Sequence, residues 1–153
     1  MQPEREYTKA KDYAFKLLSY RQRSSAELRR RLEKKGFTQP VIAETITYLG
    51  ELNYINDAEF ARVWIQERLR TRPQGKTLLR YQLRQKGVDK ELIDAALQEC
   101  AQTYDEGAAA KGLALSRRKK YRGLAPLKAK RRIYDYLRRR GFSSEAIMQA
   151  LEE

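Results

Sequence analysis

Apolar residues recur at helical spacing around three glycines, Gly36, Gly87 and Gly141. Leucine or isoleucine stands four and eight residues before each glycine, and again six and ten residues after it. Residues four apart lie on the same face of an α-helix, so each glycine is expected to separate two amphipathic helices. Because glycine readily adopts the left-handed conformation that closes a helix, each of the three should end the helix before it.

A further helix is predicted before each of these pairs. Its apolar stripe lies within residues 10–18 in the first copy, 60–69 in the second and 109–114 in the third. No segment alternates apolar and polar residues over a useful strand length. We therefore predict an all-α fold of three tandem three-helix repeats, at 1–52, 53–101 and 102–153. Stacked repeats of this kind predict an elongated, curved, solenoid-like molecule.

Polar residues at the expected helix starts support this division. Thr38, Asp89 and Ser143 are suited to cap the helices that follow the glycines, and Asn56 or Asp57 should cap the helix over 60–69. Ser24 and Glu27 form a capping-box pattern. The turn-forming stretches 73–75 and 123–126 stand before the second and third middle helices.

Charge is concentrated in the third repeat. The 153 residues contain 33 Lys and Arg against 20 Asp and Glu, a net charge of +13. Residues 111–140 contain 13 of these bases and a single acid, Asp135, which leaves +12 in that segment. Solubility does not require such a segment, and its density predicts a polyanionic partner.

The same composition argues against catalysis. The chain has no histidine and one cysteine, which removes the usual general base, the commonest zinc ligand and any internal disulfide. Cys100 falls on the apolar face of its predicted helix and is expected to behave as a small hydrophobic residue. We expect a protein that is not an enzyme and needs no cofactor or metal. The charged N-terminal residues and the lack of a long apolar run predict a soluble, cytoplasmic protein without a membrane span.

The predicted binding surface consists of basic residues that project from the middle helices and from the basic segment, with one tyrosine among them. Arginine on such faces can bind phosphate through two parallel hydrogen bonds. The alternative is an ordinary solvated helix face, which is favoured in the first repeat because Glu27 and Glu33 offset its bases. Tyr134 and Tyr136 are expected to pack against the core, whereas Tyr121 is the better candidate for a contact. The predicted contacts are Arg29, Arg30, Lys34, Arg80, Arg84, Arg117, Arg118, Lys119, Lys120, Tyr121, Lys130, Arg131, Arg138, Arg139 and Arg140.

The base before each glycine (Lys35, Lys86 and Arg140) has an equally good structural explanation. A cation in the last turn of a helix is favoured by the helix dipole. These three positions therefore support either a binding role or a purely structural one.

Four ordered stretches resemble the RecX family of RecA regulators. They are RQRSSAELRRRLEKKGF at 21–37, LGELNYINDAEFARVWIQERLR at 49–70, GKTLLRYQLRQKGVDKELIDAAL at 75–97 and LRRRGFSSEAIMQALEE at 137–153. The resemblance implies three tandem three-helix units that bind the groove of the RecA–single-stranded DNA filament. It further implies inhibition of filament extension, ATP hydrolysis, strand exchange and LexA cleavage. The expected partners are this filament together with single- and double-stranded DNA, bound by a monomer.

Two other functions are compatible with the residues. One is a stand-alone nucleic-acid binder of helix-turn-helix type, in which the helix after each glycine would enter a major groove. Those helices read VIAETITYL, LIDAALQEC and AIMQALEE, and their neutral or acidic character argues against that role. The other is a structural adaptor whose basic strip binds an acidic protein.

Overall fold

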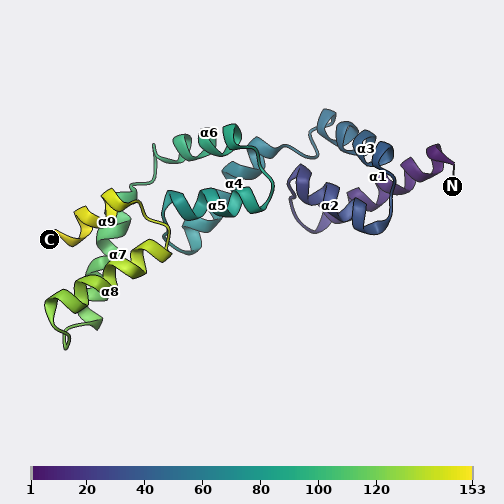
Figure 1. Cartoon of the computed structure of the whole chain (residues 1–153). Coiled ribbons are helices and arrows are strands. Elements are labelled where there is room, and N and C mark those ends of the chain that lie inside the picture. Colours follow the sequence, from purple (N-terminus) through teal and green to yellow (C-terminus); the bar gives the residue numbers. More distant parts are fainter. Residues whose placement is uncertain (1, 153) are drawn as a thin grey trace. The chain divides into compact units, whose positions relative to one another are not determined.

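The computed structural model describes residues 2–152, which form nine α-helices and no strand (Figure 1). The predicted all-α fold is confirmed. The helices are α1 (Pro3–Tyr20), α2 (Ser25–Lys35), α3 (Gln39–Glu51), α4 (Asp57–Thr71), α5 (Lys76–Gln85), α6 (Lys90–Cys100), α7 (Glu106–Lys120), α8 (Pro126–Arg139) and α9 (Ser144–Leu151).

The chain is divided into two compact units. The first contains the residues up to Ala61 together with Arg84–Ile93, and the second contains Arg62–Leu83 together with the residues from Asp94 onward. Each of α4, α5 and α6 begins in one unit and ends in the other. The repeat boundaries expected after residues 52 and 101 remain predictions.

In the first unit, α1, α2 and α3 pack against one another around an apolar core. The apolar stripe expected in the first helix supplies one side of this core, and the residues around Gly36 supply the rest. Its buried members are Ala10, Ala14, Leu17, Leu28, Leu32, Val41, Ile42, Leu49 and Ile55.

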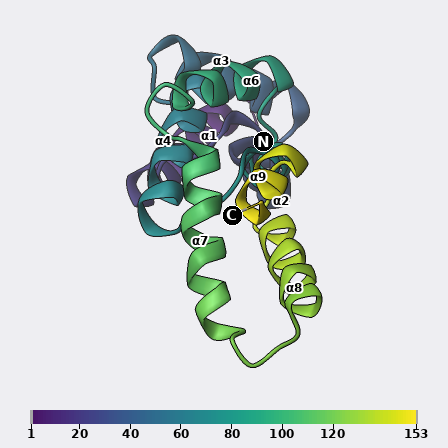
Figure 2. The same ribbon diagram turned by 90° about the vertical axis from the view of Figure 1, so that its left-hand side faces the viewer.

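In the second unit, α7 contacts both α8 and α9, and these three helices enclose a separate core (Figure 2). The buried side chains of α7 are the small Ala110 and Ala114, and α7 packs directly against α9. The buried members are Ala110, Ala114, Ile133, Leu137, Phe142, Ala146, Ile147, Ala150 and Leu151.

The three glycines adopt the predicted left-handed conformation, with φ of 100° at Gly36, 78° at Gly87 and 84° at Gly141. Two of them also touch another helix. A side chain at Gly87 would overlap Ala26 at the start of α2, and one at Gly141 would overlap Leu78 in α5. The sequence pattern predicted the turn but gave no sign of this second constraint.

Most of the predicted helix caps are present. Ser24 and Glu27 form the capping box of α2, Ser143 accepts from the Ala146 amide at 3.1 Å, and Asn56 accepts from the Glu59 amide at 3.1 Å. Thr38 differs from the prediction, because it stands at the N-cap of α3 without a side-chain capping bond. Its own amide instead donates to Glu6 Oε1 at 2.8 Å.

Candidate polyanion-binding surface

The basic segment folds into α7, the turn over 121–125 and α8, all within the second unit (Figure 2). Ile133 and Leu137 turn into the core, so the bases of α8 point to solvent. On this hairpin the exposed members of the predicted set are Lys119, Lys120, Lys130, Arg131, Arg138 and Arg139. Six of the fifteen predicted contacts are thus exposed on one hairpin, and their role in binding stays a prediction.

The other predicted contacts have different surroundings. Arg29, Arg30, Lys34 and Arg84 are exposed and belong to the first unit. Arg30 Nη1 donates to the Gln85 carbonyl at 3.3 Å, which ties α2 to the end of α5. Arg80 is half-buried in the second unit and forms an ion pair with Asp94 at 3.2 Å.

Arg118 and Arg140 donate hydrogen bonds to backbone carbonyls of their own unit. Arg118 Nη2 donates to the carbonyls of Ala150 and Leu151 at 3.0 and 3.4 Å, at the end of α9. Arg140 Nη2 donates to the Pro73 carbonyl. Burial lowers the pKa of the Arg140 guanidinium, and the nearby charge of Arg72 lowers it further. Both guanidinium groups therefore have structural partners, which the charge pattern alone did not reveal.

Tyrosine rings hold two arginines on the hairpin. The Arg117 guanidinium lies 3.8 Å from the centroid of the Tyr136 ring, and the Arg132 guanidinium lies 5.8 Å from that of Tyr121. A hydrogen bond with Tyr136 raises the pKa of Arg117. Such cation–π contacts restrict the orientation of the guanidinium groups.

The tyrosines themselves pack against the core of the second unit. This is the predicted position of Tyr134 and Tyr136. Tyr121 also packs there and is half-buried at the C-terminal end of α7, although the sequence favoured it as an open contact. Its role in binding remains a prediction.

A network of ion pairs joins the start of α2 to the turn at Lys86. Glu27 accepts from Arg21 at 2.6 Å and from Lys86 at 3.3 Å, and its side chain is 10% exposed. Ser24 Oγ donates to the Lys86 carbonyl at 2.6 Å. Burial alone would raise the pKa of Glu27, but the bonds from Arg21 and the Ser24 amide, with the charges of Arg21 and Lys86, lower it. Lys86 therefore fits the structural alternative.

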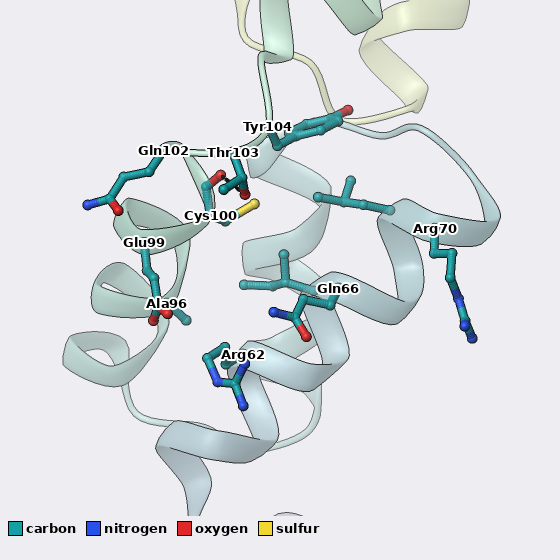
Figure 3. A pocket seen from close by; sticks show the side chains of 11 residues that line it. Arg62, Gln66, Arg70, Ala96, Glu99, Cys100, Gln102, Thr103 and Tyr104 are labelled. Atoms are coloured by element: carbon teal, nitrogen blue, oxygen red, sulfur yellow. Dashed lines mark hydrogen bonds between the residues drawn. The ribbon is translucent and has the colours of Figure 1, made fainter.

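A cavity of about 430 Å³ lies in the second unit, between α4 and the end of α6 (Figure 3). Arg62 and Gln66 approach it from α4, and Cys100 points its sulfur into it. Cys100 is only half-buried, so it is not part of the core as its helical spacing suggested; this partial burial raises the pKa of its thiol. Tyr104 donates to the Gln74 carbonyl at 2.8 Å, and burial raises its pKa to about 12.

A groove of about 420 Å³ lies where α8 begins, beside the end of α9. Apolar and basic residues both line it, among them Leu127, Ile133, Leu151, Arg118 and Lys130. The apolar residues around 124–127 are a sequence signal for this groove, although the pattern there predicts only a turn within a basic segment.

Residues 2–152 contain neither a metal-binding cluster nor a membrane-spanning helix. No group of three or more His, Cys, Asp and Glu side chains is placed to hold a metal ion there. None of the described helices combines the length and apolar character that crossing a bilayer requires.

Comparison with known families accounts for all three repeats. Residues 10–49 match the first three-helix domain of RecX, residues 56–97 the second and residues 105–151 the third. The chain belongs to the RecX family. Its three RecX domains follow one another in the family's order, which confirms the predicted tandem three-helix organisation.

Individual RecX proteins are similar over nearly the whole chain. The regulatory protein RecX of Prosthecochloris aestuarii is 36% identical over 145 residues, covering 95% of this chain and 93% of that protein. The Bacillus subtilis regulatory protein RecX is 34% identical and covers 97% of this chain, which spans 56% of that longer relative. The crystal structure of RecX from Lactobacillus salivarius shares the fold, with a TM-score of 0.89 at 23% identity over 97% of this chain and 96% of that one.

Proposed function

We propose that this chain is a non-enzymatic modulator, mainly an inhibitor, of the RecA recombinase. It binds along the groove of the RecA–single-stranded DNA filament as a cytoplasmic monomer. From there it restrains filament extension, ATP hydrolysis, strand exchange and LexA cleavage. Membership of the RecX family, whose relatives are named regulatory proteins, supports this role.

The basic α7–α8 hairpin is the observation that carries the proposal. Its exposed Lys and Arg side chains far outnumber the single acid of the segment, the exposed Asp135 of α8, and a net positive charge of this kind attracts a phosphate backbone. The proposed phosphate contacts are Lys119, Lys120, Lys130, Arg131, Arg138 and Arg139. Residues of the first unit (Arg29, Arg30, Lys34 and Arg84) and the partly buried Arg80, Arg117, Arg118 and Tyr121 complete the proposed filament surface. Arg140, whose guanidinium donates to the Pro73 carbonyl, contributes less to it.

A helix-turn-helix role would require basic or amide-rich helices after the glycines. Within the described residues, α3 and α9 contain no lysine or arginine, and α6 contains only Lys90. A recognition helix reads base edges and touches phosphates, so this composition disfavours independent duplex recognition. The basic middle helix of the third repeat, α8, fits a phosphate backbone better.

The test is the ATPase of RecA on long single-stranded DNA, titrated with this protein. Direct binding to the same DNA without RecA is measured in parallel, at a salt concentration that weakens it. We expect inhibition at amounts well below one molecule per RecA. Tight binding to DNA with no effect on RecA would contradict the proposal and favour a stand-alone nucleic-acid binder. Variants of the hairpin that no longer bind DNA provide a second test. If they inhibit RecA as strongly as the parent chain does, the result would favour an adaptor that contacts protein only.

A further inference from the structure

An apolar tip interrupts the basic hairpin where a solvent-exposed turn would ordinarily be polar. Residues 123–127 read GLAPL, with Arg122 directly before them and Lys128 directly after. Leu127 is 83% exposed, the largest value among the large hydrophobic side chains of the described residues. Polyanion binding by charge alone does not account for an exposed leucine at this place.

Leu127 is one wall of the groove beside α9. The buried side chains of Ile133 and Leu151, with Ala129, provide further apolar surface. The volume of about 420 Å³ falls within the range of small-ligand sites, about 300–1,000 Å³. A nucleobase with part of its sugar fits a space of this size.

The charged residues that line the groove are two cations and one carboxylate. Lys130 is exposed on α8, and Arg118 is held at the end of α9 by its bonds to the Ala150 and Leu151 carbonyls. Glu152 is the one carboxylate among the lining residues. A groove lined by both apolar side chains and cations suits a ligand that combines a flat, apolar part with anionic groups.

We infer that this groove holds one unstacked base of single-stranded DNA, with Leu127 against the base and Lys130 and Arg118 near the flanking phosphates. The inference rests on the proposed contact of the hairpin with DNA and adds a base-dependent component to it. Single-stranded DNA is the ligand because its bases are free to leave the stack, whereas a duplex must first expose one.

The experiment compares an oligothymidylate with an abasic oligonucleotide of equal length and charge, in the absence of RecA. We expect the protein to bind the abasic strand about tenfold more weakly, a difference of about 1.4 kcal/mol. Leu127→Ser should weaken binding to oligothymidylate by a similar factor and leave binding to the abasic strand unchanged. Its helical content should be that of the parent chain, because Leu127 is exposed.

Leu115→Ser is the matched control. Leu115 is also an exposed apolar residue of the hairpin, at 56%, but it does not line the groove. This variant should bind both strands as the parent chain does. An equal decrease in the two variants would overturn the inference, because it would mean that general apolar exposure, and not the groove, is responsible.

The remaining outcomes separate this inference from the proposed function. Equal binding of the two strands by the parent chain, with RecA still inhibited, overturns the groove assignment and leaves the regulatory proposal standing. Equal binding together with Leu127-dependent binding to phosphatidylserine vesicles would assign the apolar tip to a lipid surface instead. If the protein binds neither strand, the groove assignment is also overturned. Inhibition of the RecA ATPase is then the measurement that tests the proposed function.

Discussion

Gly141 lies directly against Leu78, so closely that a Cβ at the glycine would overlap both the side chain and the backbone of α5. The two residues are held there by backbone hydrogen bonds, from Gly75 to the Arg140 carbonyl at 2.9 Å and from Thr77 to the Gly141 carbonyl at 3.1 Å. The turn that ends α8 is therefore also the joint between α8 and α5. Gly87 has the equivalent relationship with Ala26 in the first unit.

Gly141→Ala is expected to lower the free energy of unfolding by about 2–5 kcal/mol. The left-handed conformation costs an L-residue about 1–2 kcal/mol, and the overlap with Leu78 adds about 1–3 kcal/mol. Gly36→Ala is the control, because Gly36 has the same left-handed backbone but a Cβ there would meet no described atom within 4 Å. It should show only the conformational part, about 1–2 kcal/mol. If chemical denaturation shows that the two variants are equally destabilised, the close contact between Gly141 and Leu78 does not contribute to stability.

Cys100 is expected to react slowly with a thiol reagent such as DTNB at neutral pH. Burial raises the pKa of this thiol above its ordinary 9.0 and outweighs the opposing charge of Lys76, so little thiolate is present. The rate should continue to increase as the pH passes 9, and it should reach that of an ordinary thiol when the protein is unfolded. Rapid labelling of the folded protein at pH 7, matching the denatured rate, would contradict the raised pKa of this half-buried thiol. Cys100→Ser provides the blank.

Local interactions explain why much of this fold was predictable. The apolar spacing around Leu28 and Leu32, and the glycines that close the helices, act over a few residues and are visible in the sequence. Contacts between distant residues were not visible. Nothing near Arg140 in the sequence shows that its guanidinium meets the Pro73 carbonyl, and nothing near Lys86 shows that it meets Glu27.

The candidate site shows the same division. Charge density located the α7–α8 hairpin, because net charge is a sum over residues and needs no coordinates. Which bases are free to bind depends on packing, and packing joined Arg117 to Tyr136 and Arg118 to the end of α9. The groove beside Leu127 was missed because Ile133 and Leu151 come from different helices.

Glu27→Gln is expected to destabilise the protein at neutral pH by about 1–2 kcal/mol, because its charge-assisted hydrogen bonds are removed. The folded-state pKa of Glu27 is lowered from 4.5, so its contribution is present above pH 4.5 and disappears as the pH falls through the folded-state value. The difference between the two proteins should therefore shrink below pH 4.5. Denaturant unfolding of both proteins between pH 7 and pH 3 measures this difference in the free energy of unfolding.

Glu33→Gln on the same helix is the comparison for that experiment. Glu33 is exposed and its Oε1 only accepts a long bond from Gln39 at 3.4 Å, so this variant should change stability by less than about 0.5 kcal/mol. A pH-independent difference between the parent protein and Glu27→Gln would mean that the ion pairs with Arg21 and Lys86 do not contribute.

The arginines at the end of α8 are expected to have two different roles, DNA binding and stabilisation of the fold. Arg138 and Arg139 are exposed, so their joint replacement by glutamine should weaken binding to single-stranded DNA without changing the thermal midpoint. The slope of log affinity against log salt should become shallower by about 0.7 for each phosphate that the protein no longer neutralises.

Arg140→Gln should instead lower the free energy of unfolding by about 1–2 kcal/mol, because the Pro73 carbonyl is left without its donor, and should change that slope less. Salt titrations of DNA affinity, with thermal unfolding of the same samples, distinguish the two roles. If Arg140→Gln reduced the slope as much as a binding arginine while leaving stability intact, its assignment to the joint with Pro73 would be wrong.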